Sequence, residues 1–187
     1  MRCIPNMRVV VPADSIETRK ATIAAAEMFG PVYIRFGREK VPSITRDDTP
    51  FEFGQAYCVR EGTDVAIIAC GVMVYESLVA AEELAKEGIS AMVINNHTVK
   101  PMDKETIIEA AKKTGAIVTA EEHQVAGGMG SAVLEILAQN YPVPAKMVGI
   151  YDQFGESGEP EILMKEFGLK SSNIIEAVKG VLRRKLD

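Results

Sequence analysis

The chain has 187 residues, of which 47% are hydrophobic and 25% charged, and it carries a formal net charge of −5 at pH 7. These values exclude wholesale disorder and a coiled coil, and they predict one globular domain, or one domain plus a fragment. Basic residues cluster only at the last few positions, and no apolar run approaches the ~20 residues of a membrane span, so we expect neither nucleic-acid binding nor membrane insertion. The three cysteines are odd in number and form no C-x-x-C pair, which indicates a reducing, cytoplasmic location. With only two histidines and no cysteines at ligand spacing, we expect no structural zinc site.

Residues 1–48 contain one strand–helix–strand unit and little more. An apolar run at 8–11 predicts a strand, and Asp14 followed three residues later by Glu17 predicts a capped helix start. The helix is expected to end near Met28, ahead of a Gly-Pro pair, and 32–35 predicts a second strand. This unit is too small to bury both faces of its own sheet, so we expect an incomplete part of a second α/β domain.

A polar segment at 46–50 indicates a linker. Residues 49–187, which begin within this linker, predict a complete domain. Strand-like segments at 55–60 and 64–70 flank Glu61-Gly62-Thr63, which favours a hairpin. Helices at 73–87, 103–113 and 128–138 then alternate with strands at 89–94, 115–120 and 146–150, before one or two final helices, the last capped by Asn173. We therefore expect a three-layer αβα fold whose five-stranded sheet is mostly parallel, with strand 55–60 antiparallel.

One glycine-rich turn, Gly127-Gly128-Met129-Gly130-Ser131, opens a predicted helix. A helix N-terminus can bind phosphate through its free N–H groups. However, this turn fits neither G-x-G-x-x-G nor the Walker A pattern, and six residues separate it from the preceding strand. The pattern therefore favours a tight turn, or a close backbone contact with a neighbouring subunit.

Polar residues follow two neighbouring parallel strands: 95–97, ending in His97, and 121–123, ending in His123. Both sets fall at the carboxyl edge of the predicted sheet, where open α/β folds bind ligands. A histidine beside carboxylates can act as a base or hold a metal, but no nucleophile accompanies either one. We expect an interface or loop-fixing role for both.

Arg35 and Arg38 follow the second predicted strand. A guanidinium after a strand end suits bidentate capture of a phosphate or carboxylate, and it is equally typical of a solvated loop. The spacing alone leaves both interpretations open.

Several ordered segments together resemble transketolase, in particular the C-terminal section that some organisms encode as a separate polypeptide. They are Ile4-Pro5-Asn6-Met7, Pro12-Ala13-Asp14, Asn96-His97-Thr98-Val99-Lys100-Pro101, Thr119-Ala120-Glu121-Glu122-His123, Gly127-Gly128-Met129-Gly130-Ser131-Ala132-Val133 and Phe154-Gly155-Glu156-Ser157-Gly158. The resemblance covers essentially the whole chain. It implies that residues 1–48 are the end of the pyrimidine-binding domain and that 49–187 are the transketolase C-terminal domain.

The resemblance also implies a reaction: transfer of a two-carbon ketol unit from a ketose phosphate to an aldose phosphate, in the pentose phosphate pathway. The cofactor is thiamine diphosphate with a divalent metal, Mg or Ca, and the activating glutamate of the family precedes the start of this chain. Within Arg38-Glu39-Lys40-Val41-Pro42, Arg38 occupies the position of an arginine that binds the substrate phosphate. No catalytic, cofactor-binding or metal-binding residue is carried over to this chain. We expect it to be inactive alone, to require an N-terminal diphosphate-binding section or subunit, and to form a homodimer.

Two other interpretations stay open. Deoxyxylulose-phosphate synthase and the β subunits of 2-oxo-acid dehydrogenases share the same domain pair, although the Phe154 segment and the Asn-His-Thr stretch favour transketolase. The other alternative is a non-catalytic assembly or regulatory module that retains the C-terminal domain.

Overall fold

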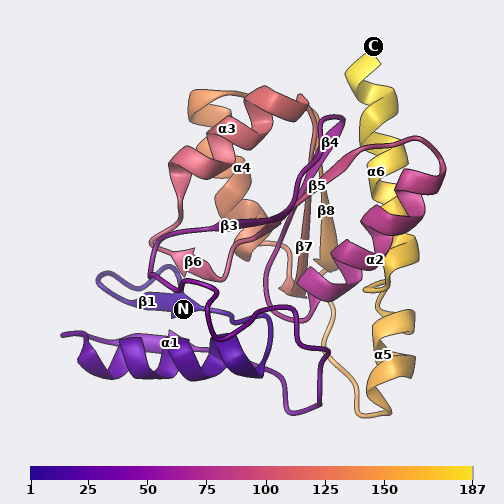
Figure 1. The fold of residues 1–187 in the computed structure, drawn as a ribbon. Helices are drawn as coiled ribbons and strands as arrows, with labels where there is room; N and C mark the ends of the chain where they lie inside the picture. Colours follow the sequence, from indigo (N-terminus) through magenta and orange to yellow (C-terminus); the bar gives the residue numbers. More distant parts are fainter. Residues whose placement is uncertain (187) are drawn as a thin grey trace.

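A five-stranded sheet forms the centre of the computed structural model, which describes residues 1–186 (Figure 1). Its strands lie in the order β3 (Tyr57–Arg60), β5 (Ala91–Asn95), β4 (Val65–Ala69), β7 (Ile117–Gln124) and β8 (Ala145–Ile150). The last four are mutually parallel, whereas β3 pairs antiparallel with β5. The expected α/β fold class, with a mostly parallel five-stranded sheet and one antiparallel strand, is confirmed.

Helices cover both faces of this sheet (Figure 1). One face is covered by α2 (Met73–Lys86) and α6 (Ser171–Leu186), and the other by α3 (Lys104–Thr114) and α4 (Met129–Asn140). A short helix, α5 (Pro160–Glu166), precedes α6. All residues of β4 and β5 are buried, which explains why their sequences are continuously apolar rather than alternating.

A smaller sheet contains the first unit of the chain. Its order is β2 (Val32–Ile34), β1 (Arg8–Val10) and β6 (Thr98–Lys100), with α1 (Ser15–Glu27) connecting β1 to β2. The sequence did not predict β6, because three residues ahead of a proline are too few to show the hydrophobic alternation of a strand. β6 pairs antiparallel with β1, so a segment of the larger domain completes the sheet of the small unit. This pairing adds a third strand to the two strands of the first unit, which stabilises its sheet.

The predicted hairpin between β3 and β4 is wrong, because β5 lies between these two strands. The connection crosses the start of β5 instead: the N–H groups of Thr63 and Asp64 donate to the Ser90 carbonyl, at 3.0 and 2.9 Å. A Cβ at Gly62 would lie 2.1 Å from the Met92 nitrogen, so only glycine fits this crossing. Gly62 therefore serves close backbone contact rather than a turn.

The predicted capping of the last helix by Asn173 is also wrong, since α6 begins at Ser171 and Asn173 lies within its first turn. Glu76 of α2 stabilises this end instead. Its carboxylate accepts from the Ser171 N–H at 2.7 Å and from Lys170 Nζ at 2.5 Å. The cap is thus supplied by a residue 95 positions earlier in the chain.

Candidate functional site

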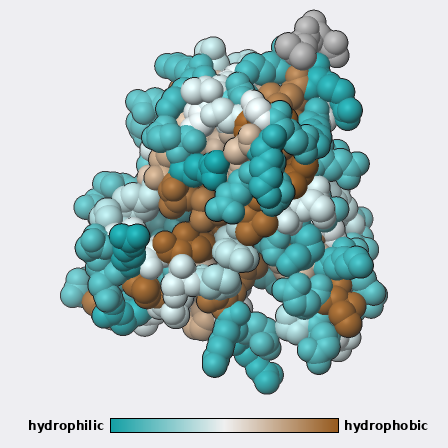
Figure 2. Space-filling model, turned by 45° about the vertical axis from the view of Figure 1, so that its right-hand side comes forward, coloured by the Kyte–Doolittle hydropathy of each residue, from teal (hydrophilic) through white to brown (hydrophobic). Residues whose placement is uncertain are grey.

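Arg38 is exposed and lines a groove of about 660 Å³. The groove lies between residues 37–42, which follow β2, and the larger domain, which contributes residues of α2 and α5, Glu122 of β7 and Lys170. Figure 2, with the side that bears α2, α5 and α6 turned forward, shows a notch in the lower part of this face, with hydrophobic residues exposed among hydrophilic ones. The guanidinium of Arg38 is therefore accessible to a ligand entering between the two units.

The segment after Arg38 is held in place by the buried Asp14 at the start of α1. The Asp14 carboxylate accepts from Glu17 N at 2.9 Å, Ile44 N at 2.7 Å, Thr45 N at 2.6 Å and Thr45 Oγ1 at 2.8 Å. Burial alone would raise its pKa, but these hydrogen bonds outweigh burial and lower the pKa of Asp14 below its ordinary value. One carboxylate thus caps α1 and anchors the chain six residues beyond Arg38.

Glu17 connects the first unit to the larger domain. Its side chain is 2% exposed and accepts from Ala13 N at 2.6 Å and from Asn95 Nδ2, at the end of β5, at 2.8 Å. Burial raises the pKa of Glu17 to about 7, although both hydrogen bonds oppose the rise. The predicted capped start of α1 is therefore present, with Asp14 as the N-cap, whereas Glu17 accepts from the residue before the cap and also forms a long-range contact.

His97 is fully buried and packs among aromatic rings. Its ring stacks on Phe51 with centroids 4.5 Å apart and lies 5.6 Å from the ring of Tyr57, while Nδ1 lies 2.8 Å from Thr98 Oγ1. Burial lowers the pKa of His97 to about 4, so the ring is neutral at pH 7. This arrangement suits packing rather than acid–base catalysis on a ligand.

Glu121 occupies the N-terminus of α4. Its side chain is 2% exposed and accepts from the N–H groups of Met129 at 2.7 Å and Gly130 at 2.8 Å. Burial raises the pKa of Glu121, and these two N–H donors oppose the rise. The N–H groups of Met129 and Gly130 at this helix N-terminus are therefore already occupied by a carboxylate of the same chain, which favours the tight turn over a phosphate site. A Cβ at Gly128 would lie 2.5 Å from Glu121 Oε2, which explains the requirement for glycine.

The remaining candidate residues at the carboxyl edge of the sheets, His123 and Arg35, are exposed or interact with backbone groups. His123 is exposed, with Nδ1 3.8 Å from Glu121 Oε2 and 2.8 Å from the Gln124 carbonyl oxygen. Arg35 Nη1 donates to the Glu122 carbonyl at 2.8 Å, which joins β2 to β7. The structure therefore brings Arg38 and Glu122 to one groove, whereas His97 is packed inside and takes no part in it.

Within residues 1–186, no group of three or more His, Cys, Asp or Glu side chains is arranged to hold a metal ion. No helix in the same part of the chain is long and apolar enough to cross a membrane.

Comparison with known proteins assigns the family. Residues 54–174 match the transketolase C-terminal domain, and residues 1–43 match the transketolase pyrimidine-binding domain. The chain belongs to the transketolase family. Its relatives in this family include three curated proteins of differing length and one solved structure.

One relative is a 6-deoxy-6-sulfo-D-fructose transketolase subunit of Clostridium sp. (strain MSTE9), 48% identical over 99% of this chain and 58% of that subunit. Another is an apulose-4-phosphate transketolase subunit of Phocaeicola vulgatus, 39% identical over 98% of this chain and 59% of that subunit. A 1-deoxy-D-xylulose-5-phosphate synthase of Desulfotalea psychrophila is 38% identical over the whole chain but only 30% of the synthase.

Among solved structures, a split-gene transketolase described as an inactive β4 tetramer superposes with a TM-score of 0.96 and is 48% identical. The match covers 99% of this transketolase-family chain and 61% of that one. The chain thus spans about three fifths of the transketolase subunits that it matches, and less than a third of the synthase.

Proposed function

We propose that this chain is the C-terminal portion of a thiamine-diphosphate-dependent transketolase, which transfers a two-carbon ketol unit from a ketose to an aldose. Residues 1–48 would complete a pyrimidine-binding domain, and 49–187 would form the C-terminal domain. The observation that carries the proposal is the agreement of the whole chain, in sequence and fold, with a split-gene transketolase. The synthase relatives support a second candidate, because they match the same residues at 36–42% identity.

Arg38 is the residue that we propose to hold the anionic end of the sugar. It is exposed on the groove between the two units, and its forked donors suit a phosphate or a sulfonate. Two of the matched subunits are named for sugars that carry such groups, a sulfonate in one and a phosphate in the other. The substrate class that we propose is therefore a ketose with a terminal anion.

We propose that thiamine diphosphate and its divalent metal are held mainly outside this chain. Family members depend on thiamine diphosphate, but residues 1–186 do not fit its diphosphate and metal: they contain no metal-ligand cluster, and Glu121 fills the glycine-rich turn. A partner section that carries the diphosphate-binding domain would have to complete the enzyme. This chain would then be inactive alone and would function in a dimer or larger assembly.

Exposed aromatic side chains support such an assembly. Phe29 and Phe154 are 99% and 97% exposed. Burying a phenylalanine in an interface contributes about 1.5–3 kcal/mol. These two residues are therefore suited to contact other parts of the complete enzyme.

The test is to express the chain with its N-terminal partner section and to offer three substrate pairs. These are xylulose 5-phosphate with ribose 5-phosphate, 6-deoxy-6-sulfofructose with glyceraldehyde 3-phosphate, and pyruvate with glyceraldehyde 3-phosphate. We expect turnover of one of the two ketose donors. Turnover of only the pair of pyruvate and glyceraldehyde 3-phosphate would assign the synthase chemistry. A chain that never associates with the partner section in native mass spectrometry would indicate a non-catalytic module.

A further inference from the structure

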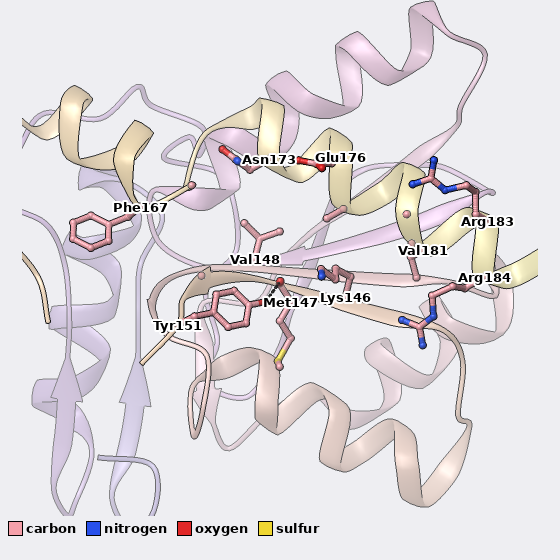
Figure 3. A pocket seen from close by; sticks show the side chains of 14 residues that line it. Lys146, Met147, Val148, Tyr151, Phe167, Asn173, Glu176, Val181, Arg183 and Arg184 are labelled. Carbon is pink, nitrogen blue, oxygen red and sulfur yellow. Dashed lines mark hydrogen bonds between the residues drawn. The ribbon is translucent and has the colours of Figure 1, made fainter. Parts of the chain in front are cut away.

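A second groove, of about 530 Å³, lies between β8 and α6 (Figure 3). Its floor includes Val148, Ala177 and Val181, which are buried, and two glycines, Gly149 and Gly180. This volume falls within the range of about 300–1,000 Å³ that is typical of small-molecule sites. Neither the proposed ketol transfer nor Arg38 involves this groove.

Three cations line it: Lys146 on β8, and Arg183 and Arg184 at the end of α6. Figure 3 shows the two arginines at one end of the groove and Phe167 toward the other, with Lys146 between them on the strand. All three cations are exposed, and no carboxylate of residues 1–186 lies within 4.0 Å of their nitrogens. Among the described residues that line the groove, Glu176 is the acidic one. In a chain of net charge −5, this groove therefore has a local excess of positive charge.

The outer edge of β8 borders the groove, because β8 is the last strand of its sheet. Its even-numbered residues face β7: the Pro144 carbonyl accepts from Ile117 N, and the Ile150 carbonyl accepts from Val125 N, both at 3.0 Å. The alternation of a strand then directs the backbone groups of residues 145, 147 and 149 outward.

Two of the three acceptors on this outward side, the carbonyls of Ala145 and Met147, already have donors. Arg184 Nη1 donates to the Ala145 carbonyl at 3.1 Å, and the Tyr151 hydroxyl donates to the Met147 carbonyl at 2.6 Å. The outward N–H of Met147 has no such partner in the described part of the chain. The groove therefore offers hydrogen-bond donors and positive charge, while its backbone acceptors at residues 145 and 147 are occupied.

We propose that this groove binds a small organic anion, with an apolar body on the floor and a phosphate or carboxylate held by Lys146, Arg183 and Arg184. An added β-strand fits less well, because it would need free acceptors as well as free donors along β8. A second copy of this chain paired through β8 would bring like charges together, which is unfavourable.

Gly180 leaves space in the groove for a ligand. It lies in the interior of α6, where glycine is unfavourable relative to alanine, and a Cβ there would meet no atom within 4 Å. Packing within the chain therefore does not require glycine at this position. Its effect is to keep the groove open.

The test uses the purified chain and three probes followed by amide chemical-shift mapping: 1-naphthyl phosphate, 1-naphthol and inorganic phosphate. We expect 1-naphthyl phosphate to shift amides of residues 146–149 and 173–184. The neutral probe and the phosphate ion, each lacking half of the proposed recognition, should bind at least about tenfold more weakly.

Variants locate the site. Gly180→Leu should fill the groove and weaken 1-naphthyl phosphate at least about tenfold without unfolding the helix, whereas Ser172→Leu, exposed on the same helix outside the groove, should not. Arg183→Gln should weaken binding about five- to tenfold, and Lys165→Gln, exposed on α5, should leave it unchanged.

Three results would overturn the proposal. The first is unchanged binding of 1-naphthyl phosphate to Gly180→Leu, or shifts elsewhere in the chain. The second is equal affinity for 1-naphthol, which would leave only an apolar surface. The third is binding of a glutamate-rich decapeptide along β8 without any binding of 1-naphthyl phosphate, which would assign the groove to a protein segment.

Discussion

Glu17 is the buried acid that joins the first unit to the larger domain, and it makes stability depend on pH. Burial raises its pKa from 4.5 to about 7, so the folded chain keeps a proton that the unfolded chain releases. Its contribution is full below about pH 4.5 and is lost as the pH rises through about 7. Between pH 5 and 8 we expect the wild type to lose roughly 3 kcal/mol of unfolding free energy relative to Glu17→Gln, which stays neutral.

Denaturant unfolding of both proteins across this pH range measures the difference. Glu27→Gln is the matched control, because Glu27 is exposed near the other end of the same helix. Parallel pH profiles for wild type and Glu17→Gln would contradict the assignment of this titration to Glu17.

Arg38 is the residue on which the proposed substrate binding depends. In the assembled enzyme, Arg38→Ala should raise the KM for the anionic sugar about 10- to 100-fold, because a charge-assisted hydrogen bond is lost, while the melting temperature stays unchanged. Arg46→Ala is the control, since Arg46 is exposed and its side chain makes no hydrogen bond within the described residues. Steady-state kinetics with phosphorylated and sulfonated donors measures the effect. An unchanged KM would remove Arg38 from the site.

The site could be predicted from sequence only where its contacts are local. Asp14 and Glu17 stand three residues apart, and their spacing indicates a helix cap directly. Their partners Thr45 and Asn95 lie 31 and 78 residues away, and no periodicity links residues across such distances. The same holds for Glu121, whose buried carboxylate could not be distinguished from a ligand group at the sheet edge until α4 was placed against it.

At the scale of elements, Glu76 couples α2 to the start of α6. Glu76→Ala would leave the Ser171 N–H and Lys170 without their carboxylate partner, and should cost about 2 kcal/mol of unfolding free energy. Thermal or denaturant unfolding measures this cost. Glu82→Ala, on an exposed position of the same helix, should change stability by less than about 0.5 kcal/mol. Equal effects of the two substitutions would contradict the proposed cap.

Two glycines with open surroundings should respond in opposite directions to alanine. Gly180 lies inside α6, so Gly180→Ala should stabilise the protein by about 0.5–1 kcal/mol. Gly88, after α2, has φ +80°, so Gly88→Ala should destabilise it by about 1 kcal/mol through backbone strain. Unfolding curves of the two variants compare them directly. The same sign for both would show that backbone conformation does not control these positions.

The order of helices and strands could be predicted where the hydrophobic residues follow a clear pattern. The central strands are continuously apolar and the helices repeat at 3.6 residues, so their order and the parallel sheet followed from the sequence. Strand neighbours did not follow, because β3 and β4 are adjacent in sequence but separated by β5 in space. β6 was missed since its three residues pair only with β1, a strand about 90 residues earlier.

For the whole molecule, the small sheet explains how the first unit is held against the larger domain. β6 completes it, Glu17 and Asp14 anchor it, and Arg35 joins it to β7. The groove that contains Arg38 lies between this unit and the larger domain. Any substrate bound there would contact both units, and the remaining contacts would come from the partner section that we propose.

The measurement that tests the central claim most directly is a titration of the N-terminal partner section with this chain, followed by thiamine-diphosphate-dependent cleavage of the ketose donor. We expect no activity from either part alone, and activity that rises with added chain until the two are equimolar. Activity of the partner section that is independent of this chain would contradict the account. So would a mixture that forms a complex and binds thiamine diphosphate but never turns over a ketose.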